Sequence, residues 1–339
     1  MPKLVSIIIP FFNEEVRLSR AILSAVNQTY SNIEIILIND GSTDNSLAIA
    51  EQIISDFSFV KLYTIPNSGL SVARNLGVEK CNGYYISFLD SDDKFHPNAI
   101  DVMVSNIKET KSDLSICKFK LKTEQDKIIT TGGWKSDKLI ISNTIAINKM
   151  YSHQIAYTSW AKLFKSNLAK KVSFPIGLWF EDRPFFLQYL LKANKVSFVD
   201  QSLLSIYTSK NSITRKPISE KRILDIQKIW EIELGIIAKN DFSADLIQLI
   251  FRNHLNSLKE TMIILTLDKP KNHSTLSDSF NKNVLRTNYQ IKTLPISYKN
   301  KLHLNFLRLY KILPRKIIGF ILKIKMSRQI EKIKNLRQY

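Results

Sequence analysis

Three aspartates close an apolar run and could do chemistry together. Residues 84–89 are mostly aromatic or aliphatic, and Asp90, Asp92 and Asp93 follow with only Ser91 between them. An apolar run of this length is typical of a strand buried in a parallel sheet, and ligands of open α/β sheets lie beyond the carboxyl ends of such strands. Two carboxylates two residues apart can bind a hard divalent cation whose shell is completed by phosphate oxygens. An Asp-rich turn without a ligand is the alternative, because Asp and Ser favour turns.

The elements that would position these aspartates alternate along the first hundred residues. Apolar runs predict strands at residues 5–9, 33–38, 60–65 and 84–89, and amphipathic stretches predict helices at residues 14–28, 43–54 and 71–79. This alternation predicts a parallel sheet with helices on both faces, whose strand ends meet at one edge because crossovers are right-handed. The polar residues expected at that edge are Asn13, Asp40, Arg74, Asp90 and Asp92. Since the sequence has neither a Gly-rich dinucleotide fingerprint nor a Walker A motif, phosphates there would need a metal ion and basic side chains.

The pattern changes beyond residue 219, where strand-like runs stop and helical periodicity takes over. We therefore predict an α/β domain followed by a helical region. The predicted boundaries are residues 1–216 for the α/β domain, with halves at 1–122 and 123–216, and residues 217–339 for the helical region.

Charge is distributed unevenly along the chain. The formal net charge is +19, yet residues 1–100 hold 7 basic and 11 acidic side chains, whereas residues 291–339 hold 13 basic and 1 acidic. A basic tail predicts an anionic partner, either a membrane surface or a nucleic acid. Residues 302–326 mix aliphatic and basic side chains, as in a helix that lies in a bilayer interface. The same stripe could instead pack against the protein.

Other features bear on the compartment. Cys81 and Cys117 form neither a metal-binding spacing nor a disulfide framework, which fits a reducing cytosol. The first residues enter a strand-like run without a signal-peptide pattern, and no apolar stretch is long enough to span a bilayer. We therefore expect a cytoplasmic protein that lies peripherally at the inner face of the cell membrane.

Six segments resemble, in the right order, the motifs of family-2 glycosyltransferases, which are nucleotide-sugar enzymes with the GT-A fold. The segments are residues 5–14 (VSIIIPFFNE), 39–44 (NDGSTD), 67–75 (NSGLSVARN), 88–93 (FLDSDD), 160–164 (WAKLF) and 180–182 (FED). The resemblance covers roughly residues 3–216 and implies a Rossmann-like sheet with a nucleotide-sugar-binding half and an acceptor half.

The resemblance also implies a site for a UDP-sugar. Residues 10–14 would hold the uracil, Asp40 would accept a hydrogen bond from uracil N3–H, and Arg74 would offset diphosphate charge. The implied nucleotide-sugar residues are Pro10, Phe12, Asn13, Glu14, Asp40, Arg74, Asp90, Ser91 and Arg215. The alternatives are a plain strand-ending turn for residues 10–14 and a solvated helix arginine for Arg74.

Asp92 belongs to the Asp-x-Asp motif and is the implied ligand of a divalent cation, Mn²⁺ or Mg²⁺. This cation would bridge the two phosphates of the UDP-sugar. The cation would stabilise the departing UDP as a Lewis acid. Some family members add a histidine ligand after the acceptor half, but residues 207–216 contain none, which leaves the identity of the metal open. We interpret Asp93 as a helix cap.

Asp182 is the implied catalytic base. Direct displacement at an anomeric carbon needs the acceptor hydroxyl to lose its proton as it attacks, and a carboxylate can accept that proton. Glu181 and Asp182 could instead be acidic residues favoured at a helix N-terminus. The implied acceptor-binding residues are Trp160, Lys162, Trp179 and Glu181, although either tryptophan could belong to a core.

These inferences predict an inverting, metal-dependent hexosyltransferase that moves a sugar from a UDP-sugar to a saccharide acceptor. By resemblance, the acceptor would be linked to polyprenyl diphosphate, in the synthesis of bacterial O-antigen, capsule or another surface polysaccharide. A nucleic-acid-binding protein is the first alternative because the pI is about 9.7, but the acidic N-terminal part and the lack of a nucleic-acid motif disfavour it. A sugar nucleotidylyltransferase is the second, and it would carry a Gly-rich loop near the N-terminus.

Overall fold

The computed structural model describes residues 1–135, 138–208, 217–268 and 273–308. The chain divides into two compact units. The sheet unit comprises Met1–Gly177 and Glu181–Ser209, and the helical unit comprises Leu178–Phe180 and Lys210–Tyr339. The predicted boundary at residue 216 lies outside the described residues, as does Arg215.

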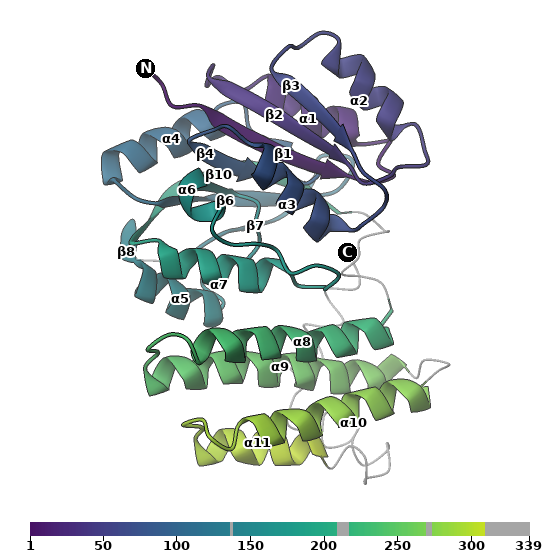
Figure 1. The fold of residues 1–339 in the computed structure, drawn as a ribbon, viewed down its shortest axis with the longest axis vertical. Coiled ribbons are helices and arrows are strands. Elements are labelled where there is room, and N and C mark those ends of the chain that lie inside the picture. The colour runs from purple at the N-terminus through teal and green to yellow at the C-terminus, as the bar shows by residue number, and fades with distance from the viewer. Residues whose placement is uncertain (136–137, 209–216, 269–272, 309–339) are drawn as a thin grey trace. The chain divides into compact units, whose positions relative to one another are not determined.

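Parallel strands form one half of the sheet unit (Figure 1). The strands and the helices between them are β1 (Val5–Phe11), α1 (Leu18–Val26), β2 (Ile33–Asn39), α2 (Ser46–Ile54), β3 (Val60–Thr64), α3 (Leu70–Lys80) and β4 (Tyr85–Phe88). Strand β1 pairs in parallel with both β2 and β4, and β2 pairs in parallel with β3. The carboxyl ends of these strands therefore share one edge, and the predicted α/β fold is confirmed.

The second half of the unit extends the same sheet. Its elements are β5 (Lys94–Phe95), α4 (Ala99–Thr110), β6 (Leu114–Lys122), β7 (Ile128–Gly132), β8 (Ile140–Ser142), α5 (Asn143–Tyr151), β9 (Lys162–Lys165), α6 (Ser166–Ala169), α7 (Asp182–Lys192) and β10 (Lys195–Tyr207). The strand order is β3-β2-β1-β4-β9-β6-β10-β5, with β7 paired to β6 and β8 to β10. Antiparallel β9 lies between β4 and β6 and joins the two halves.

Close packing of α3 against the sheet sets the position of the edge residues. Every residue of β1 and β2 is buried, as expected for strands that helices cover on both faces. A Cβ atom at Gly77 of α3 would lie 2.3 Å from Cγ2 of Ile8, so only glycine permits this approach. The N-terminal part of α3, which carries Arg74, consequently lies near the carboxyl ends of β1 and β4.

The helical unit contains the helical region that the sequence predicts. Its described helices are α8 (Glu220–Ile237), α9 (Ala244–Asp268), α10 (His273–Gln290) and α11 (Tyr298–Arg308). Trp230 stacks on His254 with ring centroids 4.8 Å apart in its core. None of the helices in the described ranges is both long and apolar enough to cross a membrane. Of the predicted amphipathic segment 302–326, only residues 302–308 are described.

Candidate active site

A buried arginine of α3 joins the end of β4 to the start of α7. Arg74 is 2% exposed, which excludes a solvated helix arginine. Its Nη2 donates to Asp90 Oδ1 at 2.8 Å, and its Nη1 donates to Glu181 Oε1 at 2.8 Å and to Asp182 Oδ1 at 3.1 Å. One guanidinium thus links Asp90 of the Asp-x-Asp motif to both acidic residues expected in the acceptor half. We call Arg74 and these three carboxylates the arginine cluster.

The arginine cluster shifts the titration of its members. Burial alone would lower the pKa of Arg74, but the three nearby carboxylates raise it above its ordinary value. Burial raises the pKa of Asp182, while the charge of Arg74 opposes this shift. Burial and the neighbouring Asp182 raise the pKa of Glu181 to about 6. Asp182 is therefore a more basic carboxylate than an exposed aspartate, and the arginine fixes its position.

The turn that follows β4 adds two carboxylates, Asp92 and Asp93, that pair directly with no described basic side chain. Burial and the charges of Asp90 and Glu14 raise the pKa of Asp92 to about 6, with Arg17 partly opposing the shift. In the part of the chain that the structure describes, no side chain donates a hydrogen bond to the Asp92 carboxylate. Asp93 is buried, and burial together with Asp92 raises its pKa well above the ordinary value. We call the turn formed by residues 90–93 the aspartate turn.

Asp93 does not cap a helix, so that interpretation is wrong. Helix α4 begins at Ala99 with Asn98 as its N-cap residue. The Asp93 carboxylate instead accepts a hydrogen bond from the backbone N–H of Tyr207, at 3.2 Å.

The donor set of the aspartate turn fits a divalent cation with a mostly non-protein shell. Among the described residues, no group of three or more His, Cys, Asp or Glu side chains is placed to hold a metal ion. Asp92 nevertheless offers a carboxylate in an electronegative setting that a hard cation would relieve. A cation there would be held by Asp92, with Asp90 nearby, and would depend on phosphate and water oxygens.

Hydrogen bonds tie the loops after the first three strands into one rim. Asn13 has a φ of 50°, and its Oδ1 accepts a hydrogen bond from the backbone N–H of Thr43 at 2.8 Å. Both oxygens of Asp40 accept backbone hydrogen bonds, from Ser68 at 2.7 Å and from Gly69 at 2.9 Å. Each Asp40 oxygen keeps a second lone pair, so this structural role is compatible with binding a donor such as uracil N3–H.

The other residues expected at the nucleotide differ in exposure. Pro10 is buried in β1, whereas Phe12 is 43% exposed just beyond the strand. Glu14 accepts a hydrogen bond from Arg17, and Ser91 is half-buried. Phe12 is therefore the residue of this set whose ring is open to a planar ligand.

The residues expected at the acceptor differ in their surroundings. Trp160 packs edge-on against Phe119 with ring centroids 4.9 Å apart. Lys162 is 1% exposed, its Nζ donates to the carbonyl of Thr158 at 2.7 Å, and burial lowers its pKa to about 7. Trp179 belongs to the helical unit, unlike Glu181. Its backbone N–H donates to Asp225 there, at 2.9 Å.

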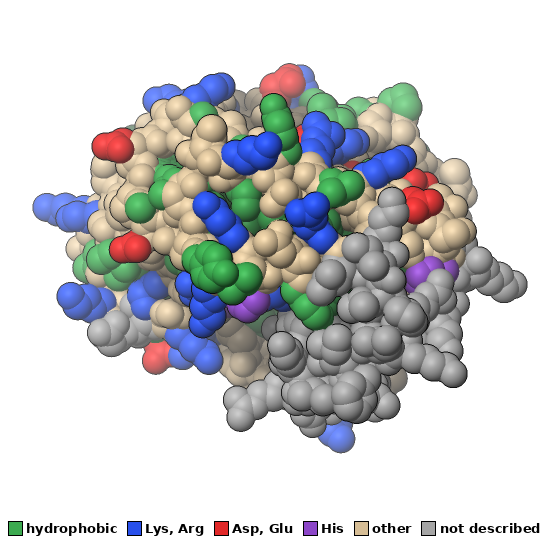
Figure 2. Space-filling model, turned by 90° about the horizontal axis from the view of Figure 1, so that it is seen from below, with side chains coloured by type: hydrophobic (Ala, Val, Ile, Leu, Met, Phe, Trp, Pro, Cys, Tyr) green, Lys and Arg blue, Asp and Glu red, His purple; other side chains and the backbone are tan. Residues whose placement is uncertain are grey.

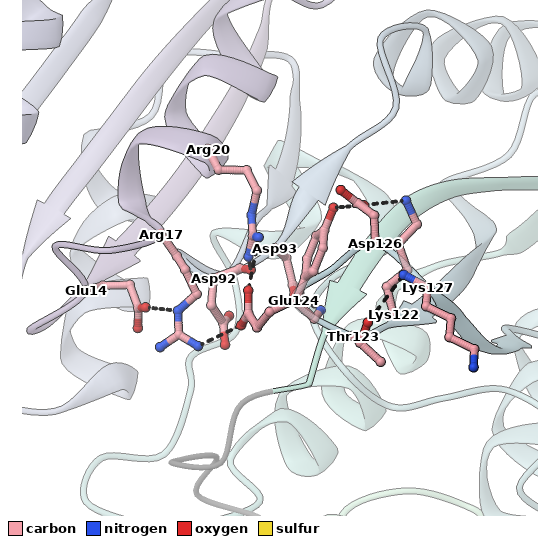
Figure 3. Close-up of polar contacts among 11 residues, drawn as sticks. Glu14, Arg17, Arg20, Asp92, Asp93, Lys122, Thr123, Glu124, Asp126 and Lys127 are labelled. Carbon is pink, nitrogen blue, oxygen red and sulfur yellow. Dashed lines mark hydrogen bonds and ion pairs between the residues drawn. The ribbon is translucent and has the colours of Figure 1, made fainter. Parts of the chain in front are cut away.

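Two arginines beside the aspartate turn were not predicted from the sequence. Arg17 pairs with Glu14, and Arg20 donates to the backbone carbonyl of Asp92 at 2.6 Å (Figure 3). The spacing of Glu14 and Arg17 is a helical ion-pair signal that could have identified one of them. Nothing in the local pattern distinguishes Arg20 from an ordinary surface arginine.

Comparison with known proteins places this arrangement in a family. Residues 6–172 match the family described as "Glycosyl transferase family 2". The cholesterol galactosyltransferase of Borreliella burgdorferi is 32% identical over 222 residues, which cover 62% of this chain and 62% of that protein. The glycosyltransferase GlyG of Streptococcus pneumoniae is 27% identical over 270 residues, which cover 77% and 90%. The chain thus spans less than two thirds of the first of these relatives.

Solved structures share the fold. Residues 1–349 of Staphylococcus aureus TarS, in complex with UDP-GlcNAc, align with a TM-score of 0.69 at 19% identity over 91% of this chain and 88% of that one. The mannosyltransferase PcManGT of Pyrobaculum calidifontis, in complex with GDP-Man and Mn²⁺, aligns with a TM-score of 0.54 at 12% identity over 99% and 84%. Residues 6–172 therefore belong to glycosyl transferase family 2, a family of sugar-transferring enzymes, and the sheet unit has the GT-A fold of these structures.

Proposed function

We propose that this enzyme is an inverting, metal-dependent glycosyltransferase that uses a UDP-sugar. One observation carries the proposal. Arg74 hydrogen-bonds to Asp90 at the end of β4 and to Asp182 at the start of α7, at 2.8 and 3.1 Å. The residue that would meet the donor and the residue that would activate the acceptor are thereby held in one rigid network, as a direct displacement requires.

The donor would bind along the rim at the carboxyl edge of the sheet. Phe12 and Asp40 would meet the base, and the aspartate turn would lie at the diphosphate. The TarS complexes with UDP-GlcNAc and with UDP support this choice of nucleotide. A divalent cation held by Asp92 would supply Lewis-acid stabilisation of the departing UDP.

Asp182 would accept the proton of the attacking hydroxyl. Burial raises its pKa and so its basicity, while its hydrogen bond to Arg74 keeps it charged and oriented. Glu181 shares the same guanidinium and would orient the acceptor. Because one displacement occurs and no carboxylate attacks the sugar, the anomeric configuration would invert.

The acceptor would be a saccharide linked to polyprenyl diphosphate at the inner face of a bacterial membrane, in the synthesis of surface polysaccharide. Residues 279–308 contain six Lys or Arg residues and no Asp or Glu. Exposed apolar side chains lie one turn apart on α10, Leu285 and Tyr289, and on α11, Tyr298 and Leu302. In Figure 2 the charged side chains on the face shown are mainly Lys and Arg. Basic and aromatic side chains together suit an anionic lipid surface.

Release of UDP from a panel of UDP-sugars, with and without a lipid-linked acceptor, tests the transfer reaction. One sugar should give acceptor-dependent release, whereas no release from any UDP-sugar would refute the proposed donor class.

Co-sedimentation with anionic liposomes tests the membrane part separately. Replacing Tyr298 and Leu302 with Ser should reduce binding at low salt. A matched variant of the sheet unit, with Ser at the exposed positions Ile128 and Ile176, should bind like the unaltered enzyme. Equal sedimentation of both variants would refute the assignment of this face.

A further inference from the structure

The aspartate turn is held by segments that are far apart in the sequence (Figure 3). The first is the start of α1, where Arg17 is the N-cap residue and Arg20 lies in the first turn. The second is residues 123–127, which connect β6 to β7 and which we call the hairpin tip. The third is Tyr207, the last residue of β10. All of them belong to the sheet unit, although more than a hundred residues separate α1 from the hairpin tip.

Three contacts fix the orientation of Arg20. Its Nη2 donates to the backbone carbonyl of Asp92 at 2.6 Å, and its Nη1 donates to Glu124 Oε2 at 3.3 Å. Its guanidinium carbon lies 3.5 Å from the centroid of the Tyr207 ring. A planar guanidinium can donate in its plane and stack on a ring at the same time, which a lysine ammonium cannot do.

The carboxylate of Glu124 also receives a second arginine. Arg17 Nη1 donates to Glu124 Oε1 at 3.3 Å, so each oxygen of this carboxylate accepts from a different arginine. Arg17 is itself held by Glu14. Both guanidinium groups are therefore directed to Glu124, and neither donates to the Asp92 carboxylate.

The hairpin tip also reaches the far end of the aspartate turn. Tyr207 donates its hydroxyl to Asp126 Oδ1 at 2.7 Å and its backbone N–H to Asp93 Oδ1 at 3.2 Å. Residues 123–127 thus connect to the turn on one side through Arg20 and on the other through Tyr207. The backbone of the turn is constrained from both sides while the Asp92 carboxylate is left for a ligand.

We propose that Arg20 and Glu124 are positioning residues for the donor site. Arg20 holds the peptide group of Asp92 and so directs the adjacent carboxylate toward the cation and the donor diphosphate, and Glu124 holds Arg20 in place. The hairpin tip is then part of the donor site although it supplies no ligand. This inference rests on the proposed function, because it concerns how Asp92 serves a metal-bound nucleotide.

The exposure of these residues favours a role in positioning over one in folding. The side chains of Arg20 and Glu124 are 25% and 38% exposed. Ion pairs at such exposed sites add little to stability. A hydrogen bond from a charged donor to a backbone carbonyl is stronger. Here that carbonyl belongs to Asp92, the residue whose carboxylate would bind the cation.

The test is calorimetric titration of UDP into the full-length enzyme with Mn²⁺ present and with EDTA. Arg20→Met should weaken Mn²⁺-dependent UDP binding about 10-fold or more, as expected when a charged hydrogen bond is lost. Glu124→Gln should weaken it about 3-fold, because one of the two arginines loses its partner oxygen. Arg20→Lys keeps one charged donor, so its UDP affinity in Mn²⁺ should lie between those of Arg20→Met and the unaltered enzyme.

Asp200→Asn provides the matched control. Asp200 is an exposed carboxylate of β10 that pairs with Lys118 on β6 and does not contact the aspartate turn. We expect this variant to bind UDP like the unaltered enzyme. Residual binding in EDTA and the midpoint of thermal unfolding should be the same for Glu124→Gln as for the control, since the positioning acts on the metal-dependent step alone.

The outcomes separate this inference from the proposed function. Equally tight binding of UDP by the unaltered enzyme in EDTA and in Mn²⁺ would refute metal dependence itself. If the unaltered enzyme needs Mn²⁺ but Arg20→Met and Glu124→Gln bind as it does, the positioning role is refuted. The positioning role is also refuted if each variant that loses UDP affinity shows a lower midpoint of thermal unfolding than the Asp200→Asn control. Glu124→Gln, at an exposed site, keeps the test decisive if Arg20→Met does not fold.

Discussion

Two groups of carboxylates lie at the same edge of the sheet and differ in what neutralises them. In the arginine cluster, Asp90, Glu181 and Asp182 share the buried guanidinium of Arg74. In the aspartate turn, Asp92 has no side-chain donor among the described residues, and burial with nearby carboxylates raises its pKa to about 6. The protein therefore pairs the arginine cluster with an internal cation and leaves the Asp92 carboxylate without a direct one.

This difference indicates a division of labour. An internal arginine orients its carboxylates permanently, which suits a base that must stay at a fixed distance from the sugar. A carboxylate without a resident cation is costly to bury and gains most when a metal ion arrives with the nucleotide. Under the proposed function, the arginine cluster would activate the acceptor, and the aspartate turn would bind the donor.

The largest effect should come from removing the base of the arginine cluster. Asp182→Asn keeps the size of the side chain and one acceptor for Arg74 but removes basicity, so transfer should fall by about 10²–10⁴-fold. UDP affinity measured by calorimetry should be nearly unchanged, because Asp92 is intact. Glu181→Gln is the matched variant. If it loses activity while Asp182→Asn retains it, the two roles are reversed.

The next largest effect should be on stability and should come from removing the internal cation, Arg74. Arg74→Met leaves three partly buried carboxylates without their partner and should lower the free energy of unfolding by about 3–5 kcal/mol at pH 7.5. The loss should shrink at pH 5.5, because unpaired carboxylates with raised pKa values take up protons as the pH falls. Denaturant titrations at both pH values measure this.

A control distinguishes that result from the general loss of an arginine. Arg286 is 62% exposed and pairs with Glu231 at 2.7 Å in the helical unit. Arg286→Met should change the free energy of unfolding by less than about 1 kcal/mol at either pH. A similar loss in both variants would contradict the idea that Arg74 is needed to neutralise a buried cluster.

The smallest effect is expected in the aspartate turn, where replacing Asp92 should increase the free energy of unfolding instead of lowering it. The pKa of Asp92 is about 6 in the folded chain and 3.8 ordinarily, so the folded protein binds the additional proton between these values. Stability of the metal-free enzyme therefore falls as the pH rises through this range. Asp92→Asn should raise the free energy of unfolding in EDTA by roughly 1–3 kcal/mol at pH 7.5 and change it little at pH 4. A destabilised variant at pH 7.5 would show that Asp92 is already satisfied without a cation.

The sequence was sufficient to predict which residues lie at the carboxyl edge of the sheet, but not the hydrogen bonds and ion pairs among them. The alternation of strands and helices, with right-handed crossovers, was sufficient to bring Asp40, Arg74, Asp90 and Asp92 to one side of the sheet. The partners of Arg74 depend on where the fold places the start of α7 relative to α3, which no local pattern encodes. For the same reason, the burial of Lys162 was not foreseen.

Long-range contacts also explain what was wrong or missing. Asp93 resembled a helix cap because Asp favours that position. The helix that follows begins only at Ala99, and Asp93 instead accepts a hydrogen bond from the backbone N–H of Tyr207. Arg20 and Glu124 are 104 residues apart, so their pairing emerges only when β6 and β7 are placed beside α1. The position of residues at the strand ends was predictable, whereas contacts between distant segments required the fold.

We propose that sugar transfer needs a cation at Asp92 in addition to the base held by Arg74. The most direct measurement is UDP release from the preferred UDP-sugar, in the presence of acceptor, before and after removal of divalent metal. Release should cease in EDTA and return with Mn²⁺ or Mg²⁺ for the unaltered enzyme, and it should not return for Asp92→Ala, which should remain folded. Undiminished release by the metal-free enzyme would contradict a requirement for the cation.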